Sequence, residues 1–123
     1  IKILVFQIST QFFCMEINKM EGIVSEKQTA NTSSGKTISV SNNIIPVLDL
    51  HETFQIPPLT SSKNMFIVLV LDSRRLAVAI DKIEGIYDIP YHNLYSVPFA
   101  VQNRTIKKIA VLGERLIPVF APE

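Results

Sequence analysis

Residues 66–86 read FIVLVLDSRRLAVAIDKIEGI and align without a gap on residues 3–23, which read ILVFQISTQFFCMEINKMEGI. The offset is 63 residues, six aligned positions are identical, and between them apolar residues mostly face apolar ones. A second match pairs Ile45-Pro46-Val47 with Ile117-Pro118-Val119 at an offset of 72 residues. Such an internal repeat predicts two similar lobes, each beginning with a long hairpin and ending with an Ile-Pro-Val strand.

Along the whole chain, short apolar segments rich in Ile, Val and Phe recur about every ten residues and are separated by Ser, Asn, Asp and Gly. This spacing is typical of an all-β protein. The expected strands lie near residues 2–9, 12–18, 22–25, 37–42, 44–49, 65–72, 75–81, 85–89, 97–102, 106–112 and 115–120. Small closed barrels would remove the unpaired edges of such apolar strands, so we expect two of them, side by side.

Local signals place the turns and one short helix. Asn42-Asn43 and Gly113-Glu114 favour tight hairpins because Asn and Gly tolerate a positive φ. Asp49 is expected to cap a short helical turn that runs through Phe54 and is stopped by Pro57-Pro58. Residues 26–36 contain no apolar side chain larger than Ala, which predicts a mobile surface loop. We expect one domain over residues 1–123, with lobes near 10–64 and 65–123 and strand 2–9 crossing between them.

Composition excludes several classes of protein. The chain has 123 residues, 47% of them apolar, and a formal net charge of +1, which gives no global attraction for nucleic acid or anionic lipid. Its single cysteine, Cys14, suits a reducing compartment such as the cytoplasm. Apolar runs such as Phe66 to Leu71 last about six residues, far short of the roughly 20 that a membrane helix requires. We therefore expect no direct membrane insertion.

The inventory of reactive side chains argues against an enzyme and against a cofactor or metal site. His51 lies beside Asp49 and is interpreted as a solvated helix residue, with a general base oriented by that carboxylate as the alternative. His92 is expected at the surface, and Cys14 in the core as an inert thiol. Neither histidine has further ligands at metal-binding spacing, and four glycines provide no phosphate loop.

A small nucleic-acid-binding barrel is an alternative, because Tyr87, Tyr91 and Tyr95 lie near a group of basic residues in the sequence. Those basic residues are Lys82, Arg104, Lys107 and Lys108. Pro90 breaks any helix that would align the tyrosines, and the balanced net charge weakens the electrostatic contribution to such binding. We therefore expect no nucleic-acid partner.

Two motifs in their order resemble the CheW-like family: Ile44-Ile45-Pro46-Val47-Leu48-Asp49-Leu50, and then Ala79-Ile80-Asp81-Lys82-Ile83-Glu84-Gly85-Ile86. The resemblance covers about residues 3 to 120. It implies two SH3-like five-stranded barrels joined by short helical turns. It also implies a noncatalytic adaptor that couples the cytoplasmic helical tip of chemoreceptors to the regulatory domain of a CheA-type histidine kinase. The receptor tip would lie in a groove between the lobes.

The resemblance also implies a contact surface in the first lobe, composed of Met20, Ile23, Ser41, Asn43 and Ile44. Ile83 and Ile86 occupy the equivalent positions of the second lobe and are weaker candidates, whereas Lys19 and Lys82 are expected to be solvated. Two positions depart from the family pattern, because Gly22 and Ser41 stand where relatives usually carry Glu and Arg. A divergent scaffold that no longer binds receptors is therefore a second alternative.

Overall fold

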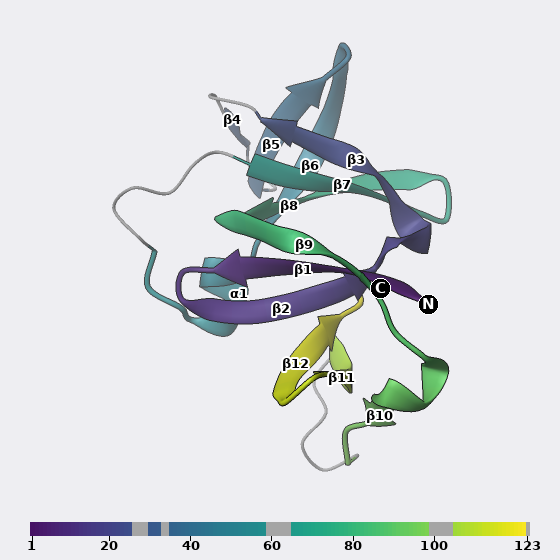
Figure 1. The fold of residues 1–123 in the computed structure, drawn as a ribbon. Helices are drawn as coiled ribbons and strands as arrows, with labels where there is room; N and C mark the ends of the chain where they lie inside the picture. The colour runs from purple at the N-terminus through teal and green to yellow at the C-terminus, as the bar shows by residue number, and fades with distance from the viewer. Residues whose placement is uncertain (26–29, 33–34, 59–64, 99–104, 123) are drawn as a thin grey trace.

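The computed structural model describes residues 1–25, 30–32, 35–58, 65–98 and 105–122 and contains two six-stranded sheets (Figure 1). Lobe 1 is the sheet whose strands, in spatial order, are β3 (Met20–Ser25), β7 (Met65–Leu71), β8 (Arg74–Ile80), β6 (Asn43–Asp49), β5 (Gly35–Val40) and β4 (Ala30–Thr32). Lobe 2 is the sheet formed by β9 (Lys82–Asp88), β1 (Lys2–Ile8), β2 (Gln11–Glu16), β12 (Arg115–Phe120), β11 (Ile106–Leu112) and β10 (Leu94–Ser96). The predicted all-β, two-lobe fold is confirmed.

The two lobes exchange a hairpin. The β1–β2 hairpin lies in lobe 2, where β1 pairs with β9 and β2 pairs in parallel with β12. The equivalent β7–β8 hairpin lies in lobe 1, where β7 pairs with β3 and β8 pairs in parallel with β6. The sheets therefore divide the chain differently from the expected lobes at 10–64 and 65–123. The hairpin of each sequence repeat belongs to the sheet that is formed otherwise by strands of the other repeat.

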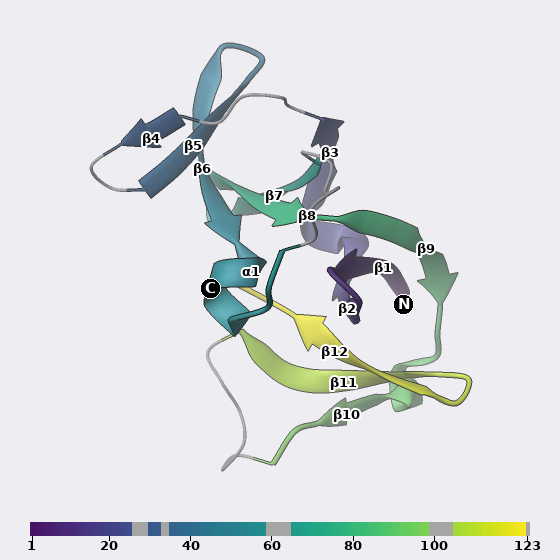
Figure 2. The same ribbon diagram turned by 90° about the vertical axis from the view of Figure 1, so that its left-hand side faces the viewer.

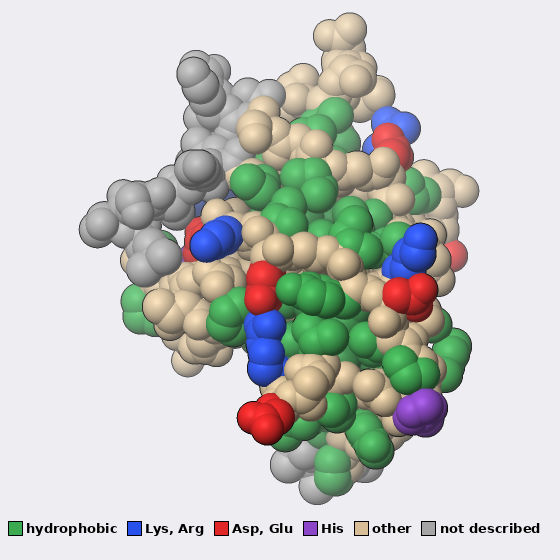
Figure 3. Space-filling view, in the orientation of Figure 1, with side chains coloured by type: hydrophobic (Ala, Val, Ile, Leu, Met, Phe, Trp, Pro, Cys, Tyr) green, Lys and Arg blue, Asp and Glu red, His purple; other side chains and the backbone are tan. Residues whose placement is uncertain are grey.

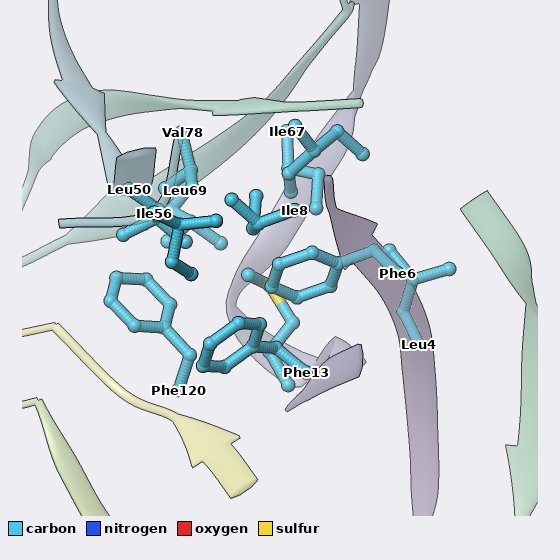
Figure 4. Close-up of a cluster of buried hydrophobic side chains, with 12 residues drawn as sticks. Leu4, Phe6, Ile8, Phe13, Leu50, Ile56, Ile67, Leu69, Val78 and Phe120 are labelled. Atoms are coloured by element: carbon cyan, nitrogen blue, oxygen red, sulfur yellow. The ribbon is translucent and has the colours of Figure 1, made fainter. Parts of the chain in front are cut away.

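Three apolar clusters fill the molecule. Ile38, Ile45 and Phe66 belong to the interior of lobe 1, around which its sheet curls (Figure 2), and Ile3 and Cys14 belong to that of lobe 2. The largest cluster joins the two lobes and is called the inter-lobe core (Figure 4). Its buried members are Leu4, Phe6, Ile8, Phe13, Met15, Leu50, Ile56, Ile67, Leu69, Val78, Ile80 and Phe120.

Strand β1 shows why the apolar runs are continuous. Leu4 and Phe6 point into the inter-lobe core, whereas Ile3 and Val5 point into lobe 2, since successive strand residues face opposite sides. The aromatic rings of Phe6 and Phe13 have their centres 6.2 Å apart in this core. A strand buried on both faces needs apolar residues at every position, as the repeat supplies.

The hairpin turns have the positive φ values that their sequences predicted, with one shift. In the β5–β6 turn the two residues are Ser41 (φ 50°) and Asn42 (φ 67°), one position earlier than expected, because Asn43 already pairs with Val40. Gly113 has a φ of 64° and lies with Glu114 between the paired residues of β11 and β12, as predicted.

The helical segments are short. Helix α1 (Leu50–Phe54) is capped by Asp49, whose carboxylate accepts a hydrogen bond from the His51 backbone N–H at 2.9 Å, which confirms the predicted cap. The helix ends at Gln55, in a left-handed conformation, before the prolines that were expected to stop it. Two single-turn 3₁₀ helices follow β2 and precede β10, namely η1 (Ile17–Lys19) and η2 (Tyr91–Asn93).

Two segments depart from the predicted strand pattern. Strand β4 and the start of β5 fall within residues 26–36, expected to be a loop, because backbone pairing holds a strand even where the sequence has no apolar residue larger than Ala. Residues 26–29 and 33–34 lie outside the described part of the chain. Strand β10 was not expected, and of the strand expected near 97–102 residues 97–98 lie outside any strand while residues 99–102 lie outside the described residues.

Candidate protein-interaction site

The β5–β6 hairpin presents Ile44 to solvent at the end of lobe 1. The Ile44 side chain is 76% exposed, whereas its neighbour Ile45 points into the lobe 1 interior. Asn43 is also exposed, and its side-chain amide donates a hydrogen bond to the Ser41 carbonyl at 3.5 Å. Residues 37–48 carry no charged side chain. A large exposed aliphatic residue within an uncharged stretch of a hairpin is a candidate contact for another protein.

The edge strand β3 carries the other two residues predicted for this surface. Ile23 is 42% exposed, whereas Met20 is partly buried against the inter-lobe core. The pairing of β3 with β7 shifts between Met20 and Gly22, and the Glu21 side chain beside this irregularity accepts a hydrogen bond from Arg75 at 2.9 Å. Glu21 therefore has an arginine partner from β8, although Gly22 and Ser41 carry neither charge.

The predicted residues do not form one patch. Strands β3 and β6 are separated in the sheet by β7 and β8. The pairing register also places Ile23 level with Leu48 of β6, four residues along the strand from Ile44. The structure brings Ser41, Asn43 and Ile44 together on the β5–β6 hairpin and leaves Met20 and Ile23 on a separate edge.

The edge strand β9 of lobe 2 repeats the arrangement of β3. Ile86 is 59% exposed, and Ile83 is partly buried against the inter-lobe core. Figures 1 and 2 place β3 and β9 on the same side of the molecule. Figure 3 shows hydrophobic side chains across the middle of that side, interrupted by a few charged groups. Ile23 and Ile86 are therefore candidates for a second apolar contact.

A bidentate ion pair fixes β9 against the β11–β12 hairpin. The Arg115 guanidinium donates hydrogen bonds to both Glu84 carboxylate oxygens, at 2.8 and 2.7 Å, and lies 4.5 Å from the centre of the Phe12 ring. Glu84 aligns with Glu21 in the repeat, so each lobe pairs the glutamate of this motif with an arginine. The hydrogen bond from Arg115, helped by its charge and that of Lys82, lowers the pKa of Glu84.

We predict that Arg115→Gln raises the pKa of Glu84 back toward its ordinary value of 4.5. Because the folded-state pKa is lowered, the ion pair stabilises the fold above the ordinary pKa and loses that contribution as pH falls through the lowered value. Carboxyl chemical shifts of Glu84 followed by NMR during acid titration measure the change. Arg74→Gln is the matched control, and an unchanged Glu84 titration in Arg115→Gln contradicts the prediction.

A small pocket opens where the two lobes meet. Buried Met15 of β2, Leu69 of β7 and Phe120 of β12 contribute to its lining. Exposed Asn18 and Lys19 of η1 also border it. The pocket therefore has apolar side chains from both lobes and a few polar groups. This combination is typical of binding pockets, in which the polar groups fix the orientation of the bound group.

Sequence reasoning missed Leu116, which is 69% exposed at the start of β12. Leu116 precedes Ile117-Pro118-Val119 as Ile44 precedes Ile45-Pro46-Val47, so the two residues are equivalent at the 72-residue offset. The offset was visible in the sequence and could have identified Leu116 once Ile44 was selected.

The reactive side chains are engaged in the fold. Burial, with a smaller effect from Glu16, raises the pKa of the Cys14 thiol to about 12, which confirms the inert core residue that the sequence predicted. His92 is exposed, as expected. The interpretation of His51 as a solvated residue is wrong, because its side chain is 14% exposed and its ring nitrogens contact Asp49 and Asp81 at 3.2 and 2.7 Å.

Within the described residues, no group of three or more His, Cys, Asp or Glu side chains is arranged to hold a metal ion. In the same part of the chain, no helix is long and apolar enough to cross a membrane. The most prominent surface features are instead exposed aliphatic residues on two equivalent hairpins and on two edge strands.

Two repeated all-β lobes that expose aliphatic residues on their hairpins and edge strands define a two-lobed all-β domain with candidate protein-contact surfaces. The chain belongs to the CheW-like domain family, whose model matches residues 2–123, and is thereby a chemotaxis scaffold of a noncatalytic family. Its structure is similar to that of the scaffolding protein TtCheW from Thermoanaerobacter tengcongensis, with a TM-score of 0.86 and 19% identity. The match covers 97% of this chain and 87% of that one. Curated proteins give no sequence match.

Proposed function

We propose that this protein is a cytoplasmic adaptor that couples chemoreceptors to a CheA-type histidine kinase through two separate protein contacts. Membership of the CheW-like family supports this role. The observation that carries the proposal is Ile44, a 76% exposed aliphatic side chain within the uncharged residues 37–48 of the β5–β6 hairpin. Burial of such a residue at the centre of an interface supplies much of the affinity, so the kinase contact is assigned to the β5–β6 hairpin.

The receptor contact is assigned to the pocket between the lobes. A receptor tip is helical, and a helix binds by laying apolar side chains into a groove. Met15, Leu69 and Phe120 give this pocket an apolar lining from both lobes, while Lys19 and Glu16 supply charges of both signs beside it. The pocket and Ile44 lie on different elements, which allows the adaptor to hold both partners at once.

The kinase contact is tested by calorimetric titration of the chain with the regulatory domain of its host's CheA-type kinase. We expect a dissociation constant in the micromolar range, weakened at least about tenfold by Ile44→Glu, because a charge at the centre of an apolar contact is desolvated without a partner. Tyr91→Glu is the matched control, since Tyr91 is 67% exposed on η2, away from the hairpin. Absence of binding at hundreds of micromolar, or an unaffected Ile44→Glu, refutes this assignment.

The receptor contact is tested with a soluble fragment of the receptor's helical tip. We expect Leu71→Glu, a half-buried position of the pocket lining, to weaken binding at least about tenfold while leaving the kinase titration unchanged. Glu52→Gln on α1 is the surface control. If the kinase binds and the receptor fragment does not, the chain is a divergent scaffold that serves a kinase alone.

Ionic strength separates this function from nucleic-acid binding. The affinity of a protein for nucleic acid falls steeply with salt because counterions are released. A contact centred on Ile44 buries apolar surface and is expected to change little over the same range of salt. The salt series uses the same calorimetric titration, with single-stranded DNA as the comparison ligand.

A further inference from the structure

Each lobe has an edge strand at the same place in the sequence repeat, and the outer edges of these two strands have no part in the proposed function. They are β3 in lobe 1 and β9 in lobe 2, the end strands of their sheets. Within the described residues no strand pairs with either outer edge, and Figure 2 shows β4, the other edge strand of lobe 1, across that lobe from β3. An unpaired edge presents backbone N–H and C=O groups to any extended chain, so proteins usually protect it.

The edge of β9 is protected in two ways. Lys82, Glu84 and Asp88 place exposed charges along it. The aromatic ring of Tyr87 lies over Gly85, with a ring carbon 3.6 Å from the point where a Cβ on that glycine would lie. Charged side chains discourage pairing with another strand, and an aromatic ring over a glycine shields the backbone that the glycine leaves bare.

The edge of β3 lacks both protections. Gly22 aligns with Gly85 at the 63-residue offset. Val24 stands where lobe 2 has Tyr87, so lobe 1 has no ring to cover this glycine. Apart from Gly22 and its chain neighbours, no atom of the described residues lies within 4 Å of the point where a Cβ on Gly22 would lie. Residues 22–25 carry no charge, and the backbone of β3 is therefore open where that of β9 is covered.

The charge on β3 is satisfied within the chain. Glu21, the one charged residue of β3, accepts a hydrogen bond from the Arg75 side chain at 2.9 Å. Both side chains are 42% exposed, and their charges neutralise each other. A charged residue on a strand added along residues 22–25 would lose water without gaining a partner of opposite charge. The partner that fits this edge is therefore uncharged over the stretch that pairs.

The two faces of β3 define the side chains of that partner. A residue directly opposite Gly22 on an added strand lies on the same face of the sheet as the glycine, where the space that Tyr87 fills in lobe 2 is empty. An aromatic side chain fits there. The residues before and after it point to the opposite face, beside Ile23, whose side chain is 42% exposed. Aliphatic β-branched side chains fit at those two positions.

We propose that the outer edge of β3 binds an extended, uncharged segment of another protein as an added strand, with an aromatic residue of that segment covering Gly22. In this mode of recognition the backbone hydrogen bonds supply affinity and the alternating side chains supply specificity. The contact goes beyond the adaptor function, because it depends on neither the kinase nor the receptor.

The test is an NMR titration of the isotope-labelled chain with the peptide acetyl-Ser-Thr-Val-Tyr-Val-Thr-Ser-amide. We expect saturable shifts of the backbone amides of residues 22–25, with a dissociation constant of about 0.1 to 1 mM, while the amides of β9 stay unchanged. The same peptide with Ala in place of Tyr is expected to bind at least about threefold more weakly, because the cover over Gly22 is lost. The peptide with Pro in place of both Val residues keeps the ring but cannot pair, so we expect no binding.

Gly22→Val is the matched variant of the protein. Its side chain enters open space, and Gly22 is not among the residues with a positive φ, so the fold is expected to persist. Because the added side chain occupies the space beside the backbone, the Tyr and Ala peptides are expected to bind this variant with equal affinity. Circular dichroism verifies that the variant is folded, and Gly22→Ala replaces it if it is not.

Any of four outcomes overturns the proposal: no saturable shift of residues 22–25 at about 2 mM peptide, equal affinities of the Tyr and Ala peptides for wild type, binding of the Pro peptide, or equal shifts in β9. A fifth is a change in the amides of residues 22–25 on dilution without peptide, which identifies a second copy of the chain as the occupant of the edge. Because no kinase or receptor is present, failure here leaves both contacts of the adaptor intact, and failure of those titrations leaves this one intact.

Discussion

Replacing Leu4 by Ala is expected to lower the free energy of unfolding by about 2 to 5 kcal/mol, the range for a large-to-small change in a packed core. Leu4 is 1% exposed and lies on β1, between β2 and β9, with its side chain in the inter-lobe core. Removal of its side chain leaves a cavity between two sheets, and neither sheet can close it without disturbing its own pairing.

Leu116→Ala makes the same chemical change at an exposed position. Leu116 also lies on a strand of lobe 2, but its side chain is 69% exposed. We expect it to change stability by no more than about 0.5 kcal/mol. Urea denaturation at a common slope gives both values, and similar losses for the two variants refute the inter-lobe core as the main source of stability.

The same denaturation curves test the cooperativity of the lobes. Because buried side chains of both sheets form the inter-lobe core, unfolding of either lobe exposes the part of that core that belongs to the other. Wild type and Leu4→Ala are therefore expected to unfold in one transition, seen at the same urea concentration by different spectroscopic probes.

The strands could be predicted from the sequence because a buried strand requires a run of apolar residues. Residues 3–6 are apolar without interruption, and the structure buries all four between two clusters. Strand β4 has no such apolar run, since backbone hydrogen bonds to β5 hold it irrespective of side-chain type. Strand 2–9 was expected to cross between the lobes, but the exchange of the whole β1–β2 and β7–β8 hairpins was not, because a repeat shows which segments are alike without showing which half each one pairs with.

For the candidate site, the sequence suggested which residues to consider but not how deeply each of them is buried. Ile44 is as exposed as a contact residue should be, whereas Met20 and Ile83 are partly buried against the inter-lobe core. Alternation of apolar and polar residues does not distinguish these cases. A half-buried residue at the rim of a core and an exposed residue beyond it can lie on the same face of a strand. Whether the named residues bind partners stays a prediction.

His51 was misjudged because its main partner is distant in the sequence. Asp49, two residues away, was visible as a helix cap, but Asp81 is 30 residues away, at the junction of β8 and β9. The Asp81 carboxylate also accepts a hydrogen bond from the backbone N–H of Ser9, in the β1–β2 turn. The side chain of His51 therefore ties α1 to the point where the chain passes from lobe 1 to lobe 2.

Replacing His51 by Leu is expected to lower the free energy of unfolding by about 2 to 4 kcal/mol. The Asp81 side chain is 6% exposed, so loss of the imidazole leaves a buried carboxylate with the Ser9 N–H but without its closest side-chain partner. His92→Leu is the matched control, because His92 is exposed on η2 and its loss is expected to change stability by no more than about 0.5 kcal/mol.

A double-mutant cycle shows whether the loss arises from the unpaired carboxylate. Asp81→Asn keeps an oxygen that accepts from Ser9 but removes the charge, so it should cost less in the His51→Leu background than in wild type. Additive losses in the two single variants would mean that His51 stabilises the fold by packing alone, and that the contact with Asp81 contributes nothing to the junction of the lobes.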